Sequence, residues 1–308
     1  MPEKIVITAD PGIDTAFAIA LALHDPRLEV LGLAATAGNV SSDQATKNIH
    51  ILIEQMDPPR WPKLGAALPL EYDIDGTEYH GPDGLGGLSF ACSQLHNIHP
   101  SDKMLLDFVD FYPEEIVVVC MGPLTTLATA LDRDSSLASR VKRVVCLGGT
   151  LSEPGNAGPV SEFHFTCDPT AARAVLQAGF SLTLIPLDEM RKLLFSPTDL
   201  LQLPSPNSST CQFLKKIVPY GIRGASNMYG VEGFHLKDVL GVVAASHSDW
   251  IKTEPMLVDV ESQGELTRGM MVVDHRRGRT VPPNVEMAVD VDVEAIRQYI
   301  NDTLARTT

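Results

Sequence analysis

The sequence lacks a long apolar segment. No run approaches the ~20 consecutive apolar residues that a membrane-spanning helix needs, although 44% of the 308 residues are hydrophobic. The chain begins Met1-Pro2-Glu3-Lys4, without the apolar core of a secretory signal peptide. We therefore expect a cytoplasmic protein with no membrane partner.

Cysteine and basic residues are also scarce. The five cysteines are odd in number and scattered, and no two form a C-x-x-C pair, so neither a disulfide framework nor a zinc-finger spacing is indicated. Cys120 and Cys146 lie in apolar runs, where a reduced, buried thiol is the ordinary state, as in a reducing cytosol. With 24 Lys and Arg against 39 Asp and Glu, the formal net charge is -15. Such a surface repels polyanions, which argues against nucleic acid as a partner.

Two nucleotide-binding motifs are absent as well. No G-x-G-x-x-G follows the first apolar run, and no G-x-x-x-x-G-K-[ST] occurs anywhere. These absences give little support to a dinucleotide-binding fold and argue against a P-loop nucleotide hydrolase.

What is present is a regular alternation of strand-like and helix-like stretches. The strand-like runs cover residues 4–9, 29–36, 115–121, 143–147 and 181–186. The helix-like stretches cover residues 15–24, 42–55, 101–111, 124–131 and 169–177. This alternation predicts an α/β fold with an open, mainly parallel sheet and helices on both faces.

The C-terminal part has a different pattern. Residues 200–233 look helical with Pro and Gly breaks, and residues 234–246 resemble a further helix. Residues 255–261, 269–274 and 285–291 alternate like the strands of a meander, and a last helix is predicted over 293–304. We interpret this part as a small C-terminal β/α extension of one domain spanning residues 1–308, because no linker, repeat or low-complexity tract interrupts the chain.

The most informative segment is Thr8-Ala9-Asp10-Pro11-Gly12-Ile13-Asp14-Thr15, directly after the apolar run Ile5-Val6-Ile7. Pro-Gly ends the strand, which places Asp10 and Asp14 at its carboxyl end, where ligands bind in open α/β sheets. Carboxylates there suit a hard cation or sugar hydroxyls. The alternative for Asp14 is that it caps the following helix.

Further polar or glycine-containing turns follow the other strands. They include Ala37-Gly38-Asn39, Gly122-Pro123-Leu124-Thr125, Leu147-Gly148-Gly149, Gly155-Asn156 with Ser161-Glu162-Phe163, Cys167-Asp168-Pro169, Pro186-Leu187-Asp188, Asp238 and Gly264-Glu265-Leu266-Thr267-Arg268-Gly269. In that order, and together with the Asp10 segment, the series resembles the nucleoside hydrolase family, the inosine–uridine-preferring nucleoside N-ribohydrolases. The resemblance covers nearly the whole chain.

The resemblance implies hydrolysis of the N-glycosidic bond of a ribonucleoside to ribose and free base. It implies a calcium ion that binds the ribose hydroxyls and the attacking water, with Asp10 as both metal ligand and general base. Asp238 and the Met121 backbone carbonyl are implied as further ligands. Such a site makes chemical sense, because anionic oxygens stabilise an oxocarbenium-like transition state and a metal lowers the pKa of its water.

The same resemblance assigns residues to the substrate. Asp14 and Asn39 are implied on the ribose 2′-hydroxyl side, and Asn156 and Glu162 on the 5′-hydroxyl side. His80, in His80-Gly81-Pro82-Asp83-Gly84, matches a loop that closes over the sugar. The implied substrate-binding residues are therefore Asp14, Asn39, His80, Asn156, Glu162, His164 and Asp238. A nucleoside is the expected partner, and family members are commonly homo-oligomers.

The chain departs from the family pattern at four positions. Thr15 replaces an acidic metal ligand, and Thr8 replaces a nearby Asp, so the calcium site loses negative charge. His164 replaces a sugar-binding Asn and retains hydrogen-bonding capacity. Lys237 stands where many members have a His that protonates a departing purine.

Lys237 has two interpretations at this point. It assists the leaving base as a catalytic acid, which requires a lowered pKa, or it simply pairs with a carboxylate, which we favour. His235, two residues earlier, is not expected to share a helix face with it. The remaining histidines, His50 among them, show no metal-ligand spacing.

Two rivals to the hydrolase remain open. Thr8 and Thr15 favour a catalytically impaired member that binds nucleoside or ribose without turnover. A phosphotransferase with Asp10 as its nucleophile is weaker, because the usual D-x-D-G-T-like context is absent. The preferred base does not follow from the sequence.

Overall fold

The computed structural model describes residues 1–70, 76–93, 98–205, 207–278 and 280–307. Its centre is a nine-stranded sheet with the order β10-β13-β7-β6-β5-β1-β2-β3-β4. The strands are β1 (Glu3–Ala9), β2 (Leu28–Ala35), β3 (Lys63–Ala66), β4 (His99–Pro100), β5 (Val117–Met121), β6 (Arg143–Leu147), β7 (Leu182–Ile185), β10 (Ile251–Met256) and β13 (Val285–Val291). All neighbours are parallel except β10 and β13.

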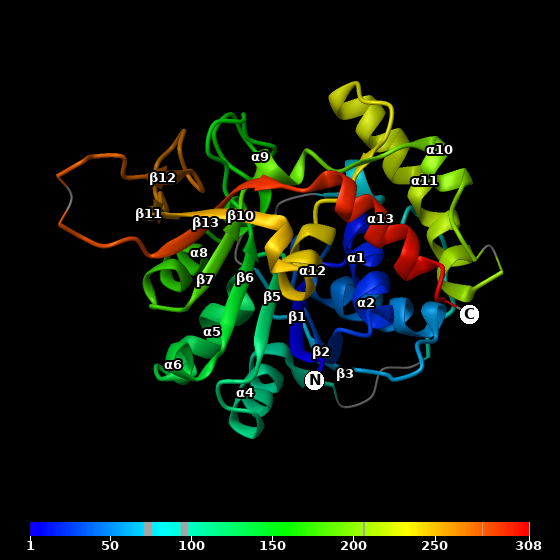
Figure 1. The fold of residues 1–308 in the computed structure, drawn as a ribbon, viewed down its shortest axis with the longest axis horizontal. Coiled ribbons are helices and arrows are strands. Elements are labelled where there is room, and N and C mark those ends of the chain that lie inside the picture. Colours follow the sequence, from blue (N-terminus) through cyan, green and yellow to red (C-terminus); the bar gives the residue numbers. More distant parts are fainter. Residues whose placement is uncertain (71–75, 94–97, 206, 279, 308) are drawn as a thin grey trace.

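Helices cover both faces of the sheet, as Figure 1 shows. One face carries α1 (Ile13–His24), α2 (Ser42–Met56), α11 (Ser209–Tyr229), α12 (Val239–Ser246) and α13 (Val293–Leu304). The other carries α4 (Ser101–Phe111), α5 (Thr125–Arg133), α6 (Leu137–Arg140) and α8 (Pro169–Gln177). Each layer has its own apolar core, so the predicted α/β class with helices on both faces is confirmed.

Short elements complete the chain. They are α3 (Thr77–His80), α7 (Phe163–Cys167), α9 (Leu187–Met190), α10 (Pro197–Leu201), the 3-10 turn η1 (Ser248–Trp250), the pair β8 (Leu194–Phe195) and β9 (Phe234–His235), and the pair β11 (Val258–Val260) and β12 (Met271–Val273). Among the described helices, none is long and apolar enough to cross a membrane.

Helices α1 and α12 are apolar on all sides because both are enclosed in the core beneath the sheet. Helix α1 is buried from Ile13 to Ala22, and α12 is buried from Val239 to Ala245. The two helices pack against each other beneath the sheet, and helices that are hydrophobic all round are the ones that a core encloses. Their amino-terminal ends therefore hold Asp14 and Asp238 rigidly at one edge of the sheet.

The C-terminal part differs from the expected meander. Strands β11 and β12 do pair with each other, but β13 enters the main sheet between β7 and β10. The β10 strand itself was not predicted, because its sequence Ile-Lys-Thr-Glu-Pro-Met is mostly exposed and has no clear apolar alternation. Alternation along β13 shows that it is a strand, but it carries no information about its partner.

The predicted helix over 234–246 is also wrong in its first part. Phe234 and His235 form β9, which pairs with β8, and the helix begins at Val239. Phe234 is completely buried and stacks on Tyr79 at 5.1 Å between ring centroids. Tertiary packing of one aromatic ring thus overrides a local helical pattern.

Candidate active site

The carboxyl ends of the central strands converge on one cavity. The chain runs from β1 to β2, β3 and β4 on one side and returns to β5 on the other, so a topological switch point lies between β1 and β5. The cavity lining includes Asp10, Asp14, Asn39, Tyr79, His80, Asn156, Glu162, Phe163, His164, Tyr229, Lys237 and Asp238. A larger cavity of about 1220 Å³ lies between α8 and the β11–β12 pair, and none of the predicted site residues lines it.

Asp10 is the first residue after β1 and is completely buried. The Asn39 backbone N–H donates to its Oδ2 atom at 3.2 Å, and the Asn39 side-chain amide donates to its carbonyl at 2.9 Å. Its Oδ1 atom has no hydrogen-bond partner in the described part of the chain. Burial, followed by the nearby Asp238 and Asp14 charges, raises the Asp10 pKa well above its usual range.

Two glycines make room for this carboxylate. A Cβ on Gly38 would lie 2.3 Å from Asp10 Oδ2, and a Cβ on Gly122 would lie 2.8 Å from the Asp10 nitrogen. Both distances are too short for any side chain, so the turns after β2 and β5 need glycine to pack against Asp10.

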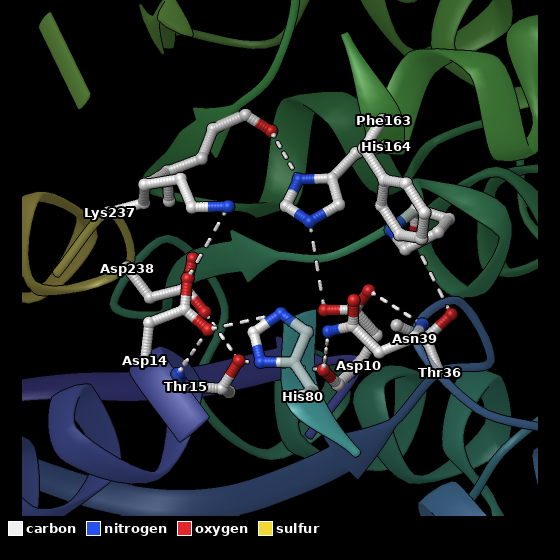
Figure 2. Close-up of polar contacts among 12 residues, drawn as sticks. Asp10, Asp14, Thr15, Thr36, Asn39, His80, Phe163, His164, Lys237 and Asp238 are labelled. Atoms are coloured by element: carbon white, nitrogen blue, oxygen red, sulfur yellow. Dashed lines mark hydrogen bonds and ion pairs between the residues drawn. The ribbon is translucent and has the colours of Figure 1, made fainter. Parts of the chain in front are cut away.

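Asp238 reaches the same place from the start of α12. The Thr15 hydroxyl donates to Asp238 Oδ2 at 2.5 Å and lies 3.4 Å from the Asp10 carbonyl. Figure 2 shows Asp10, Asp14, Thr15 and Asp238 converging from two segments of the chain. Burial and the Asp14 charge raise the Asp238 pKa well above its usual range.

Met121 closes the group. It ends β5, pairs with Ala9 in the sheet, and its carbonyl accepts from the Asp10 N–H at 3.3 Å. Carbonyl oxygens have a second lone pair, so Met121 retains one for a ligand. Thr8 is buried in β1, where it pairs with Cys120 of the neighbouring strand β5. It does not line the cavity, so its substitution acts at most indirectly.

This arrangement fits a hard divalent cation. Buried Asp10 and Asp238 repel one another, and an unpartnered carboxylate oxygen at full burial is costly. The donor set of Asp10, Asp238, the Thr15 hydroxyl and the Met121 carbonyl is all oxygen, which calcium prefers. The sequence-predicted ligands are thus brought together by the fold.

Lys237 provides positive charge on the other side of the carboxylates. Its Nζ atom lies 3.8 Å from Asp14 Oδ2 and 4.8 Å from the centroid of the Tyr79 ring. Burial alone would lower the Lys237 pKa, but Asp14 and its other neighbours outweigh burial and raise it. Lys237 is therefore a permanently charged partner of Asp14.

Asp14 itself is not the cap of α1. The capping position is Gly12, which offers no side chain, and His80 takes the capping role because its Nδ1 atom accepts from the Ile13 N–H at 3.1 Å. The proton of the neutral ring is therefore on Nε2, which lies 3.8 Å from Asp14 Oδ1. Burial lowers the His80 pKa to about 4, so His80 is neutral at physiological pH.

The loop after β6 brings the remaining predicted residues. Glu162 caps α7 and accepts from the Phe165 and Gly149 backbone N–H groups. Asn156 Oδ1 accepts from the Phe163 N–H at 2.8 Å, which leaves its amide N–H groups for the cavity. His164 Nε2 lies 3.7 Å from the unpartnered Asp10 Oδ1.

Asp188 has a structural task outside the cavity. Its two oxygens accept from the backbone of Leu151, Ser152 and Glu153 and from the Thr150 and Ser152 hydroxyls. It thereby fixes the turn after β6 rather than capping the next segment.

Sequence reasoning missed Tyr79 and misjudged His235. Tyr79 contacts Lys237 and has no motif of its own. His235 lies in β9 and not on a helix, and it lines a small cavity with Lys237, Asn156 and Tyr229. The helix-face argument that separated His235 from Lys237 is therefore wrong.

The aromatic side chains of Phe163 and Tyr229 line the main cavity. Phe234 does not line it, because it packs beneath Tyr79.

The fold and site together define the class. Acidic and amide side chains gathered at the switch point of an open parallel sheet are typical of enzymes that bind polar, hydroxylated substrates beside a cation.

The chain belongs to the inosine-uridine preferring nucleoside hydrolase family, whose model matches residues 5–298. It is therefore a ribonucleoside hydrolase, and the predicted family and enzyme class are confirmed.

Similar proteins include both plant and bacterial relatives. Uridine nucleosidase 1 of Arabidopsis thaliana is 33% identical over 99% of this chain and 94% of its own length. The non-specific ribonucleoside hydrolase RihC of Escherichia coli is 31% identical over 99% of both. Among solved structures, the plant nucleoside hydrolase PpNRh1 has a TM-score of 0.90 at 27% identity, covering 99% of both chains. A purine-preferring ribonucleoside hydrolase from Gardnerella vaginalis has a TM-score of 0.91 at 25% identity, covering 98% of both.

Proposed function

We propose that this protein hydrolyses the N-glycosidic bond of ribonucleosides with a calcium ion held by Asp10, Asp238, Thr15 and the Met121 carbonyl. The observation that carries the proposal is the fully buried, unpartnered Asp10 Oδ1 atom beside Asp238. When bound, calcium would lower the pKa of the attacking water and hold the ribose hydroxyls.

Asp10 takes the proton of the attacking water. Its carboxylate lines the cavity beside Asp238, and general bases of this kind contribute about 10²–10⁴-fold. Asn39 holds the Asp10 backbone and carboxylate in place through two hydrogen bonds. The negative charge of the cluster also stabilises the oxocarbenium-like transition state.

The ribose is held by groups on both sides of Asp10. Asp14 and Asn39 face one side, and the free amide of Asn156 and Glu162 face the other. The Nε2–H of neutral His80 and the His164 ring offer further hydrogen bonds to sugar hydroxyls. Lys237 holds the Asp14 carboxylate and keeps its proton, so it acts on the sugar-binding side and not as an acid for the base.

The substrate class proposed is the ribonucleosides as a whole. The relatives include a uridine nucleosidase, a non-specific ribonucleoside hydrolase and a purine-preferring ribonucleoside hydrolase. Phe163 and Tyr229 supply apolar ring faces in the cavity, which accept purines and pyrimidines alike. We place the activity in nucleoside metabolism and base salvage.

Replacing Asp10 with Asn tests this proposal. Asn keeps the shape and one oxygen but cannot accept a proton, so base release should fall about 10⁴-fold or more. Inosine, uridine, cytidine, adenosine and a nitrophenyl riboside are assayed with excess calcium, and circular dichroism checks the fold.

Three results would contradict the proposal. If the Asp10→Asn protein retains activity, Asp10 is not the general base. If exhaustive chelation leaves the activity unchanged, calcium is not required for hydrolysis. Nucleoside binding without turnover by the wild-type protein favours the impaired-member alternative.

We also propose a cytosolic homo-oligomer. All five cysteines are free thiols, as a reducing compartment maintains them. Light scattering on the purified protein measures its molar mass against the 33.3 kDa chain, and a monomer would contradict the assembly.

A further inference from the structure

A second group of metal-ligating side chains lies on α2, apart from the cavity lining. His50 and Glu54 lie one turn apart on this helix, and Cys92 comes from the segment that follows the glycine-rich loop. One ligand atom from each residue lies within 4.8 Å of the others. The expectation for His50 rested on spacing along the sequence alone, whereas Cys92 is distant from it in sequence.

The donor chemistry is unlike that of the Asp10 cluster. A nitrogen, a carboxylate oxygen and a thiol sulfur form a mixed set that suits zinc and related transition metals rather than calcium. Zinc bonds of ~2.0–2.3 Å place tetrahedral ligands roughly 3.3–3.8 Å apart. The three side chains therefore need to close by about 1 Å, and water supplies the fourth position.

The contacts around the group bring Cys92 to the helix. The Ser93 N–H donates to both Glu54 oxygens, at 3.4 and 3.2 Å. His50 Nε2 lies 3.1 Å from Glu54 Oε1. A pair of exposed residues one turn apart on a helix would show the same contact, but here both side chains are largely enclosed, at 15% and 20% exposure.

The imidazole also has an unused nitrogen. His50 Nδ1 is buried and has no hydrogen-bond partner among the described residues. An ordinary surface ion pair would leave this atom in water, whereas a buried unpartnered ring nitrogen costs free energy. A metal bound to either ring nitrogen fixes the tautomer of the other.

We propose that His50, Glu54 and Cys92 form a binding site for Zn²⁺ or a similar transition metal. Helix α2 also holds the glycine-rich segment through Asn48, whose amide donates to the Asp83 carbonyl at 2.7 Å. A metal on His50 and Cys92 clamps the far end of the same segment. Its occupancy thus restrains the loop that begins at His80 of the active site.

Metal titration with matched variants tests the site. Zn²⁺ binding is measured by calorimetry and Co²⁺ binding by thiolate-to-metal absorption, in wild type, Cys92→Ser, His50→Gln and the control His24→Gln. His24 is another helical histidine, and its ring contacts the Ala20 carbonyl of its own helix. We expect wild type and control to bind one more metal ion than the two site variants, and we expect a thiolate band that both site variants lose.

Binding of zinc by the Asp10 carboxylates does not depend on Cys92. The difference between the wild-type and Cys92→Ser titrations therefore reports on the α2 site alone. Equal stoichiometry, affinity and absorption in wild type and Cys92→Ser would overturn the proposal. This outcome is independent of nucleoside turnover, which the Asp10→Asn assay tests.

Thiol reactivity gives a second measurement. Cys92 is the one partly exposed cysteine of the five, so a maleimide reports on it selectively. Zn²⁺ should slow its modification about tenfold or more, because a coordinated thiolate is shielded. An unchanged rate at saturating Zn²⁺ would overturn the site.

Discussion

At the scale of single residues, Thr15 distinguishes this chain from the pattern of the family that it resembles. Its hydroxyl donates a hydrogen bond to Asp238 Oδ2 at 2.5 Å. A neutral side chain therefore takes the position at which the family pattern has a charged metal ligand. The hydrogen bond offsets part of the repulsion between Asp238 and Asp10 in the metal-free protein. The same substitution removes a formal negative charge from the cation site.

Thr15→Asp should therefore tighten calcium binding by on the order of one to a few kcal/mol, because a charged ligand replaces a neutral one. Without calcium the variant should be less stable than wild type, since a further carboxylate then joins Asp10, Asp14 and Asp238. Calorimetry and thermal unfolding measure the two effects. Thr15→Val is the matched control, and it should weaken calcium binding; affinity that stays equal or falls in Thr15→Asp would contradict the assignment.

Lys237 has two alternative roles. Its charge either pairs with Asp14 or assists the departure of the base. Its contact with Asp14 and its raised pKa favour the first. Lys237→Met should then cost about 3–5 kcal/mol of stability by leaving Asp14 unpaired. Turnover should fall by a similar factor for inosine and for a nitrophenyl riboside, whose leaving group needs no proton.

The opposite outcome is equally clear. If inosine hydrolysis falls ~10²-fold more than nitrophenyl riboside hydrolysis, Lys237 assists the leaving base. Lys216→Met, an exchange on the partly exposed side of α11, controls for the loss of one lysine.

At the scale of elements, α1 and the glycine-rich loop depend on one another. Helix α1 begins at Ile13, and the preceding Gly12 provides no side-chain cap. The His80 ring from α3 instead accepts the Ile13 N–H. Gly81, Gly84, Gly86 and Gly87 have positive φ angles, which glycine adopts without steric cost. The helix that carries Asp14 and Thr15 is thus capped by the histidine that precedes this loop.

This contact should make stability depend on pH through His80. Its folded pKa of about 4 lies below the usual 6.5, so the unfolded chain binds more protons between these values. The stabilisation is complete above pH 6.5 and declines as pH falls toward 4, by at most about 3 kcal/mol.

His80→Gln keeps an acceptor for Ile13 but does not titrate. Urea unfolding at pH 7 and pH 4.5 should show a larger loss for wild type than for the variant, by about 2 kcal/mol. The pKa of His235 is also lowered to about 4. His235 titrates in both proteins, so its contribution to the pH dependence cancels in the comparison. Parallel losses would show that the ring does not cap α1 in its neutral form.

At the scale of the whole molecule, charge and metal binding act together. The chain carries a formal net charge of -15, and two of its carboxylates, Asp10 and Asp238, are buried side by side with raised pKa values. An acid with a raised folded pKa stabilises at low pH and loses that contribution as pH rises through the folded pKa. The proposed calcium ion would replace the protons at higher pH.

Calcium should therefore raise the melting temperature more at pH 8 than at pH 5, where it must displace protons. At 100 times the dissociation constant the gain is about 2.7 kcal/mol, which is roughly 4 °C for a chain of 308 residues at ~2.1 cal/mol/K of unfolding entropy per residue. Differential scanning calorimetry with calcium, magnesium and chelator measures it. The shift should vanish in Asp10→Asn, and an equal calcium shift in that variant would place the ion elsewhere.

The sequence alone predicted those features that depend on residues within one segment of the chain. Helices α4, α8 and α13 and strand β6 have the predicted bounds, because apolar periodicity and Pro or Asp at helix starts are local signals. The segment from Thr8 to Thr15 likewise places Asp10 after a buried strand. The fold class and family follow from such segments taken in order.

Only the tertiary structure decided which side chains meet. Thr15 and Asp238 are 223 residues apart, and the three side chains of the proposed α2 site show no spacing that a motif search could find. Pairing of β13 with β7, the β-strand conformation of Phe234 and the capping of α1 by His80 are also non-local. Their free energy comes from burial and contacts between distant segments, and no local pattern of residues encodes the identity of a distant partner.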